Sequence, residues 1–172
     1  MNELINVAAY CRVSTDHSDQ LNSLSAQIEY FTDYISQQPG WRLKEVYFDE
    51  GISGTSLKKR VSFNRMISDA ENGEIGLILT KEVSRFARNT VDTLQLTRKL
   101  TANNVGVIFT NDGIDTRDKD GELRLTIMAS IAQLLTRMIT YVFACRNGLI
   151  NWHKAFTMNT KKKPFPKQAA DL

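Results

Sequence analysis

Ser14 and Arg12 stand two residues apart in the stretch A-A-Y-C-R-V-S-T-D-H, where an apolar run gives way to polar sequence. A serine hydroxyl becomes a nucleophile when its proton is removed, and a neighbouring arginine binds anions strongly. On the local pattern alone, a turn or cap serine is the favoured interpretation. The two interpretations differ in what should lie nearby, because a nucleophile needs helper residues and a turn residue does not.

The elements that must position these residues alternate along the chain. Apolar runs predict strands, and apolar residues recurring three and four positions apart predict helices. The predicted strands are 7–11, 43–48, 75–80 and 105–109, and the predicted helices are 24–35, 63–70, about 89–103 and a long one from Glu122. Pro39-Gly40 and Asn72-Gly73 should end the first two helices, and Asn89 or Thr90 should cap the third.

This alternation predicts an α/β, Rossmann-like fold. We expect a mostly parallel central sheet of about four to five strands with helices on both faces, followed by the long C-terminal helix. Strand 75–80 is almost entirely apolar and should be buried on both faces. Ligands of such sheets bind beyond the carboxyl ends of the strands, so helpers of Ser14 should follow the other strands.

Basic residues do follow three of the predicted strands. They are Arg12 after the first, Lys58, Lys59 and Arg60 beyond Asp49 after the second, and Lys81, Arg85 and Arg88 after the third. Considered alone, each of these residues could instead be a charged side chain exposed to solvent or a residue of a turn. Their joint placement favours a phosphate site, because a guanidinium binds phosphate oxygens in a bidentate way.

Attack on a phosphodiester requires stabilisation of the negative charge that develops on phosphate oxygens in the transition state. The sequence has only two histidines and two cysteines and no clear cluster of metal ligands, so arginines are expected to supply the positive charge. The predicted chemistry is phosphoryl transfer through a phosphoserine, without a metal or another cofactor.

The composition sets wider limits. The chain has 172 residues, 42% of them hydrophobic and 24% charged, and a net charge of +3, as expected for one globular domain. Two cysteines far apart indicate a reduced, intracellular protein. The N-terminus does not resemble a signal peptide, and the apolar run 138–145 is too short to span a bilayer. We therefore expect a cytoplasmic protein without a membrane partner.

Six motifs occur in one order between residues 7 and 133. They are Y-C-R-V-S-T, S-L-S-A-Q, F-D-E-G-I-S-G, T-K-E-V-S-R-F-A-R-N, N-D-G-I-D-T and I-M-A-S-I-A-Q. Together they resemble the catalytic domain of serine site-specific recombinases, in particular the large serine branch of phage integrases and conjugative-transposon recombinases.

The resemblance implies a role for each matching residue. Ser14 would attack a scissile DNA phosphate, forming a 5′-phosphoserine link and freeing a 3′-hydroxyl. The phosphate would be held by Arg12, Arg85 and Arg88, with Arg60 assisting. The resemblance further implies supporting roles for Tyr10, Gln27, Asp49, Lys81 and Ser84, and DNA contacts for Lys58, Lys59 and Arg137.

The resemblance also implies partners. These are double-stranded DNA recombination sites and further copies of the chain, as a dimer and as a tetramer in the synaptic complex, with the long helix as the dimerisation element. A full-length recombinase or a directionality factor is a further expected partner, and the gene would belong to a bacterium, a phage or another mobile element.

Departures from the family pattern begin after Gln133. Leu134 and Leu135 stand where acids are usual, and the chain ends without a zinc ribbon. We expect a catalytic domain over 1–120, an oligomerisation helix region over 121–156 that is atypical after 133, and a basic, disordered tail over 157–172. Two functions remain open: a recombinase catalytic domain, or a truncated, non-catalytic remnant that acts as a dimerisation module. A receiver-like signalling domain is disfavoured, because its site would need clustered acids and magnesium.

Overall fold

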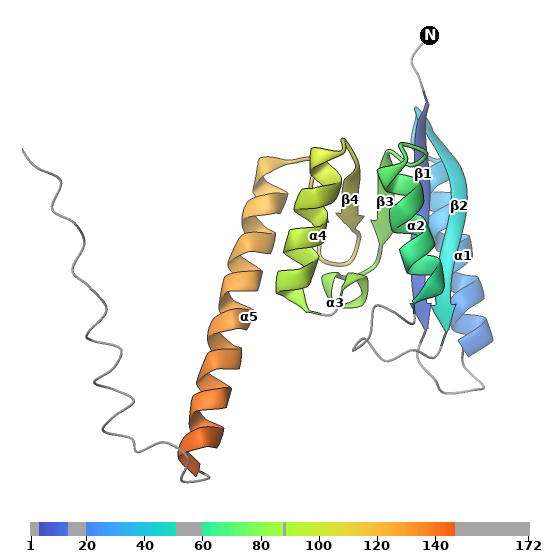
Figure 1. Ribbon diagram of the computed structural model, residues 1–172. Helices are drawn as coiled ribbons and strands as arrows, with labels where there is room; N and C mark the ends of the chain where they lie inside the picture. Colours follow the sequence, from blue (N-terminus) through green and yellow to red (C-terminus); the bar gives the residue numbers. More distant parts are fainter. Residues whose placement is uncertain (1–3, 14–19, 51–59, 88, 147–172) are drawn as a thin grey trace, which may run out of the picture. The chain divides into compact units, whose positions relative to one another are not determined.

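The computed structural model describes residues 4–13, 20–50, 60–87 and 89–146 (Figure 1). The predictions on Ser14, Lys58, Lys59, Arg88 and the tail over 157–172 lie outside these residues. The elements are β1 (Ile5–Val13), α1 (Gln20–Ser36), β2 (Trp41–Glu50), α2 (Val61–Glu71), β3 (Leu77–Thr80), α3 (Val83–Phe86), α4 (Thr90–Ala102), β4 (Gly106–Phe109), β5 (Ile114–Asp115) and α5 (Lys119–Arg146).

The sheet has five strands in the order β2-β1-β3-β4-β5. The first four strands are parallel, and β5 pairs antiparallel with β4. The predicted mostly parallel α/β sheet is confirmed, including the burial of β3, all four residues of which are buried. The sequence reading placed β5 in a loop, because its two residues are too few to form a recognisable apolar run.

Alternate residues of β1 face opposite sides of the sheet and enter two separate cores. Val7, Ala9 and Cys11 pack with Phe31 and Ile35 of α1 on one face. The second core lies on the other face and contains Ala8 and Tyr10 of β1 together with side chains from α2, α3, α4 and α5. Figure 1 shows α1 and α2 on opposite sides of β1 and β2, so helices cover both faces, as predicted.

Helix ends follow the turn residues in the sequence. Asn89 is the N-cap of α4, and its side chain accepts a hydrogen bond from the Asp92 N–H at 2.9 Å. The turns after α1 and α2 contain Gly40 at φ +87° and Gly73 at φ +78°, conformations that glycine adopts without strain. These three predicted helix boundaries are confirmed.

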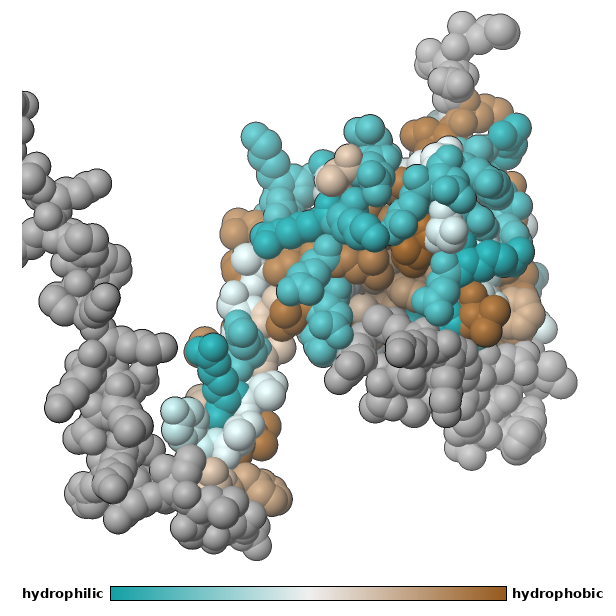
Figure 2. All heavy atoms as spheres, viewed as in Figure 1, coloured by the Kyte–Doolittle hydropathy of each residue, from teal (hydrophilic) through white to brown (hydrophobic). Residues whose placement is uncertain are grey.

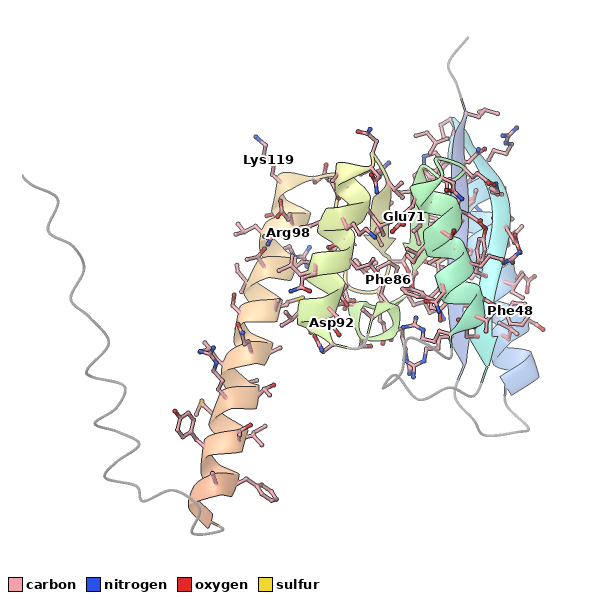
Figure 3. The ribbon with its side chains drawn as sticks, viewed as in Figure 1. Phe48, Glu71, Phe86, Asp92, Arg98 and Lys119 are labelled. Carbon is pink, nitrogen blue, oxygen red and sulfur yellow. The ribbon has the colours of Figure 1, made fainter. Side chains whose placement is uncertain are left out.

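The chain divides into two units, Met1–Ala132 and Gln133–Leu172, and the boundary falls within α5. In the first unit, Leu125 and Ala129 of α5 are buried, and Arg98 of α4 donates to Glu122 of α5 at 2.9 Å (Figure 3). In Figure 2 hydrophilic residues cover much of the visible face over α2 and α4, whereas apolar and hydrophilic residues both appear along α5.

Apolar side chains are exposed along α5 in both units. The large ones are Leu123, Ile127, Met128, Ile131, Leu134, Leu135, Met138, Ile139, Tyr141, Val142 and Phe143. By length and mean hydropathy alone, Lys119–Ala144 resembles a membrane-spanning helix. The same two properties occur in helices that associate with other protein chains.

Candidate active site

Arg60 occupies the N-cap position of α2 at the carboxyl edge of the sheet, and its side chain is completely buried. Its Nε donates to the Tyr10 hydroxyl at 3.0 Å, and its Nη2 donates to the backbone carbonyl of Arg85, also at 3.0 Å. The Nη1 atom is buried and has no hydrogen-bond partner in the part of the chain that the structure describes. Arg60 therefore connects β1, α2 and α3 and retains donor capacity.

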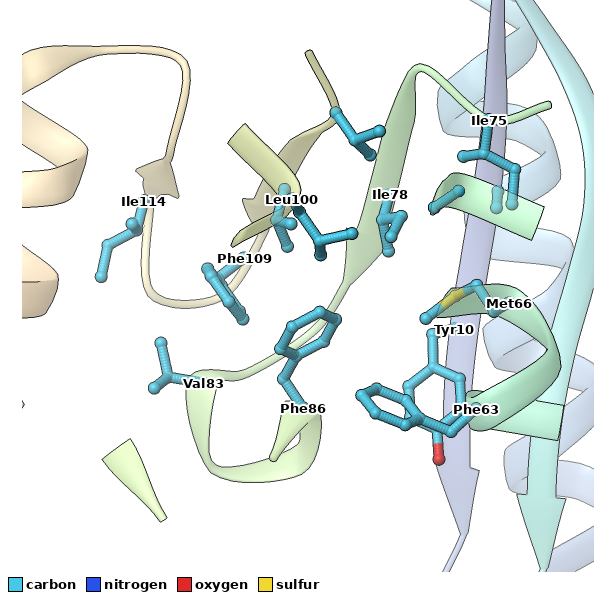
Figure 4. Packing of buried hydrophobic residues seen from close by; sticks show 14 of the residues in the cluster. Tyr10, Phe63, Met66, Ile75, Ile78, Val83, Phe86, Leu100, Phe109 and Ile114 are labelled. Carbon is cyan, nitrogen blue, oxygen red and sulfur yellow. The ribbon is translucent and has the colours of Figure 1, made fainter. Parts of the chain in front are cut away.

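A row of aromatic rings supports this arginine. Tyr10, Phe63, Phe86 and Phe109 follow one another edge to face, with centroid separations of 5.1, 5.3 and 5.5 Å (Figure 4). The Arg60 guanidinium carbon lies 4.0 Å from the centroid of the Phe63 ring. Aromatic faces attract cations and partly replace the water that burial removes from the guanidinium.

Asp49 holds the start of α2 from the end of β2. Its carboxylate accepts hydrogen bonds from the N–H groups of Ser62 and Phe63 and from the Tyr10 hydroxyl, each at 3.0 Å. Free N–H groups of a first helical turn need acceptors, and the N-cap side chain of Arg60 provides none. Asp49 thus acts as a remote cap, and it places the Arg60 backbone beside β1.

Burial raises the pKa of the Tyr10 hydroxyl well above its ordinary value, although the neighbouring Arg60 charge acts in the opposite direction. The hydroxyl therefore stays protonated over the physiological range. It can donate to Asp49 while it accepts from Arg60, and this fixes the direction of the hydrogen-bond chain.

Arg85 belongs to α3, which is only one helical turn long. Its side chain is 45% exposed, and its Nε lies 3.9 Å from Glu82 Oε2. Phe86, the next residue, is fully buried in the aromatic row. The turn is therefore anchored to the core by Phe86 and presents the guanidinium of Arg85 to solvent.

Arg12 is the penultimate residue of β1 and lies opposite Asp49 of β2 in the parallel register. Its pKa is lowered, chiefly by burial and then by the positive charges of Arg60 and Arg85. Like charges shift a pKa in this way only when they are close. Arg12 of β1, Arg60 at the start of α2 and Arg85 of α3 lie at one edge of the sheet, where Arg60 donates to the Tyr10 hydroxyl of β1 and to the Arg85 carbonyl. That these arginines act together on one phosphate stays a prediction.

The other predicted site residues differ in their burial and in the element that carries them. Gln27 is buried on α1, and Lys81 follows β3, with its Nζ 5.9 Å from the Tyr30 ring centroid. Ser84 is exposed on α3 and donates to Glu82 at 2.9 Å. Arg137 belongs to the second unit of the chain and is exposed there.

Two residues at this edge were missed by the sequence reasoning, namely Phe63 and Asp112. Phe63 was predicted only as part of an apolar helix face, although an aromatic three residues after an arginine can reach its guanidinium. Asp112 accepts a hydrogen bond from the Val83 N–H at the start of α3, at 2.7 Å. Its position just after β4 was the available signal, since the edge rule applied to the other strands also covers this loop.

Comparison with known proteins identifies the family of this chain. The family model described as "Resolvase, N terminal domain" matches residues 7–141. The Tn3 transposon resolvase of Escherichia coli is 30% identical over 135 residues, which cover 78% of this chain and 66% of the relative. A site-specific recombinase of Escherichia coli is 31% identical over 130 residues, covering 76% and 62%. The chain thus spans slightly less than two thirds of the length of these relatives.

Two solved structures have the same fold. The N-terminal catalytic domain of TP901-1 integrase is 32% identical, with a TM-score of 0.63, covering 77% of this chain and 98% of that one. A resolvase-family site-specific recombinase from Streptococcus pneumoniae is 31% identical, with a TM-score of 0.69, covering 85% and 99%. From the family match over most of its length and the agreement in fold, we conclude that the chain belongs to the resolvase N-terminal-domain family of serine recombinases.

Proposed function

We propose that this chain is the catalytic domain of a DNA recombinase that cuts and rejoins strands through a phosphoserine at Ser14. The observation that carries the proposal is the placement of Arg12, Arg60 and Arg85 at one edge of the sheet, with Arg60 hydrogen-bonded to the Tyr10 hydroxyl and to the Arg85 carbonyl. Ser14 lies two residues beyond Arg12 in the sequence, and the similar proteins include recombinases, resolvases and an integrase.

The proposed step is a transesterification. The Ser14 oxygen forms a bond to phosphorus while the bond from phosphorus to the 3′-oxygen breaks, and the serine proton is lost as the leaving oxygen gains one. One phosphodiester replaces another, so no external energy source is needed. Attack by a 3′-hydroxyl on the phosphoserine reverses the step and rejoins a strand.

In this proposal the three arginines have different roles. Arg12 and Arg85 bind the non-bridging oxygens, where the negative charge of the transition state accumulates. Arg60 is held by Tyr10 and by the Arg85 carbonyl and offers its Nη1 to the phosphate or the serine. Gln27, Lys81, Ser84 and Asp49 remain proposed supporting residues, and Arg88, Lys58, Lys59 and Arg137 remain proposed contacts to phosphate or DNA.

The test is covalent capture on nicked duplex DNA with randomised flanks, followed by denaturing electrophoresis and sequencing of the captured strands. Wild-type protein should form a protein–DNA adduct, and Ser14→Ala should form none. Ser36→Ala is the matched control, because its hydroxyl only donates to the Asp33 carbonyl at the exposed end of α1. An adduct that persists in Ser14→Ala refutes the assignment.

The exposed apolar residues of α5 support a second candidate, a module that pairs with recombinase chains without cutting DNA. The double substitution Leu134→Glu and Leu135→Glu should abolish self-association in sedimentation velocity experiments if this face pairs with a second copy. Adduct formation by the wild-type chain alone would exclude a purely non-catalytic module. A wild-type chain that stays monomeric at high concentration would exclude pairing with its own copies.

A further inference from the structure

The one-turn helix α3 carries Arg85 and depends on neighbouring segments for its position. An isolated turn of four residues is not stable by itself. At its start the Val83 N–H donates to Asp112 Oδ2 at 2.7 Å, and near its end the Arg85 carbonyl accepts from Arg60 at 3.0 Å. The orientation of Arg85 is therefore set by contacts at both ends of the turn.

Asp112 lies in the loop between β4 and β5, and this loop is fixed on two sides. The Asn111 N–H donates to the Lys81 carbonyl at 2.8 Å, which extends the pairing of β3 and β4 beyond the strands. On the other side, Arg124 of α5 donates from Nη1 to the Gly113 carbonyl at 2.6 Å and from Nη2 to the Asp112 carbonyl at 3.0 Å. Arg124 thus holds two consecutive carbonyls with one guanidinium.

The first turns of α5 are themselves closely bound to the sheet. A Cβ atom at Gly121 would lie 1.9 Å from the Asp115 carbonyl oxygen, so glycine lets the helix backbone approach β5. Leu125, the residue after Arg124, is fully buried. A displacement of this part of α5 therefore has to move the Arg124 guanidinium, and the loop that it holds, relative to β4.

We propose that Asp112 and Arg124 are positioning residues that link α5 to the phosphate-binding turn of α3. Arg124 holds the 112–113 loop, the loop directs the Asp112 carboxylate, and the carboxylate holds the Val83 N–H and so the orientation of Arg85. The catalytic meaning of this link rests on the function proposed above. The link itself rests on three hydrogen bonds and requires no catalysis.

Hydrogen exchange tests the link without any substrate. The amides of residues 83–86 should exchange at least tenfold faster in Arg124→Ala than in wild type, although the hydrogen bonds of Arg124 go to the 112–113 loop and not to α3. Asp112→Ala should have the same effect, and Asp112→Asn should restore slow exchange because its amide oxygen still accepts. The double variant Asp112→Ala/Arg124→Ala should exchange no faster than Asp112→Ala.

Arg98→Ala is the matched control, because Arg98 also binds α5 but donates to Glu122 and Thr126 of that helix and not to the 112–113 loop. Exchange at residues 83–86 should remain as in wild type in this variant. The link is overturned if Arg124→Ala leaves that exchange unchanged, or if Arg98→Ala accelerates it equally.

A second measurement connects the link to catalysis. At saturating DNA, Arg124→Ala and Asp112→Ala should form the phosphoserine adduct at least tenfold more slowly, with unchanged DNA affinity, and Asp112→Asn should recover most of the rate. Wild-type adduct rates in both alanine variants would overturn the positioning role. A wild-type chain without any adduct would instead refute the proposed function, and the exchange experiment would still decide whether the link exists.

Discussion

Replacement of Tyr10 by phenylalanine removes one oxygen from the hydrogen-bond chain between Asp49 and Arg60. The ring stays in the aromatic row, so the substitution leaves no cavity in the core. The Arg60 Nε loses its acceptor at a position without solvent access, because Arg60 is 0% and Tyr10 1% exposed. The Asp49 oxygen that accepted from Tyr10 still accepts from the Phe63 N–H, so most of the cost falls on Arg60.

When a buried donor of a charged group loses its acceptor, the free energy of unfolding falls by about 1.5–3 kcal/mol. This is the loss expected for Tyr10→Phe. Tyr47→Phe is the matched control, since Tyr47 is also only 1% exposed but its hydroxyl donates, at 2.6 Å, to the carboxylate of Asp69, which is partly exposed and can be hydrated once the hydroxyl is removed. In Tyr47→Phe the free energy of unfolding should fall by about 0.5–1.5 kcal/mol, the contribution of an ordinary hydrogen bond. Urea unfolding followed by circular dichroism measures both values, and the dependence on urea should be the same for both variants.

Adduct formation separates the two variants more sharply. Tyr10→Phe should slow the capture of DNA by Ser14 because Arg60 is no longer held, whereas Tyr47→Phe should react as wild type does. Equal losses of stability in the two variants, together with unchanged adduct rates, would show that the Tyr10 hydroxyl does not position Arg60.

Three further predictions concern other parts of the first unit. Gly121→Ala should lower the free energy of unfolding by about 1–3 kcal/mol in urea titrations, as in an overpacked core, although alanine usually stabilises helices. In a Cys145→Ser background, Cys11 should resist alkylation in the folded protein at pH 8 and react once urea is added, because burial raises the pKa of its thiol to about 12. Since the unfolded thiol ionises near its ordinary value of 9.0 and the folded one does not, stability measured by urea titration should decline as the pH rises above 9. Arg60→Lys should destabilise the fold by about 2–4 kcal/mol, because a lysine cannot make both hydrogen bonds and stack on Phe63, and thermal unfolding would show the loss.

Much of the fold was accessible from local pattern. Strand β3 is buried on both faces and therefore apolar throughout, and Asn89 caps α4 with a side chain suited to that role. Strand β5 was missed because two residues hold their place through pairing with β4 and through Thr116, whose hydroxyl accepts from the Val107 N–H at 2.8 Å. Such contacts depend on tertiary structure and leave no periodic signal.

The candidate site also has some features that local sequence predicts and others that depend on tertiary contacts. The position of each arginine close to the end of a predicted strand led to the prediction that Arg12, Arg60 and Arg85 act at one edge of the sheet. Sequence patterns carried no information on the complete burial of Arg60, because a charged residue in a polar loop normally faces solvent. Its burial depends on Phe63, Tyr10 and the Arg85 carbonyl, which come from three different elements.

The two aspartates at this edge have a consequence for which ligands the site accepts. Asp49 and Asp112 direct carboxylate oxygens to backbone N–H groups at the starts of α2 and α3. Between the residues that the structure describes, no ion pair joins either aspartate to Arg60. The carboxylates of these two aspartates thus accept from backbone amides, and Asp49 also accepts from the Tyr10 hydroxyl, while the Arg60 Nη1 has no acceptor among the described residues. If the site binds its ligand as proposed, this surplus of donors favours ligands that only accept hydrogen bonds, such as a phosphodiester, over cations and amines.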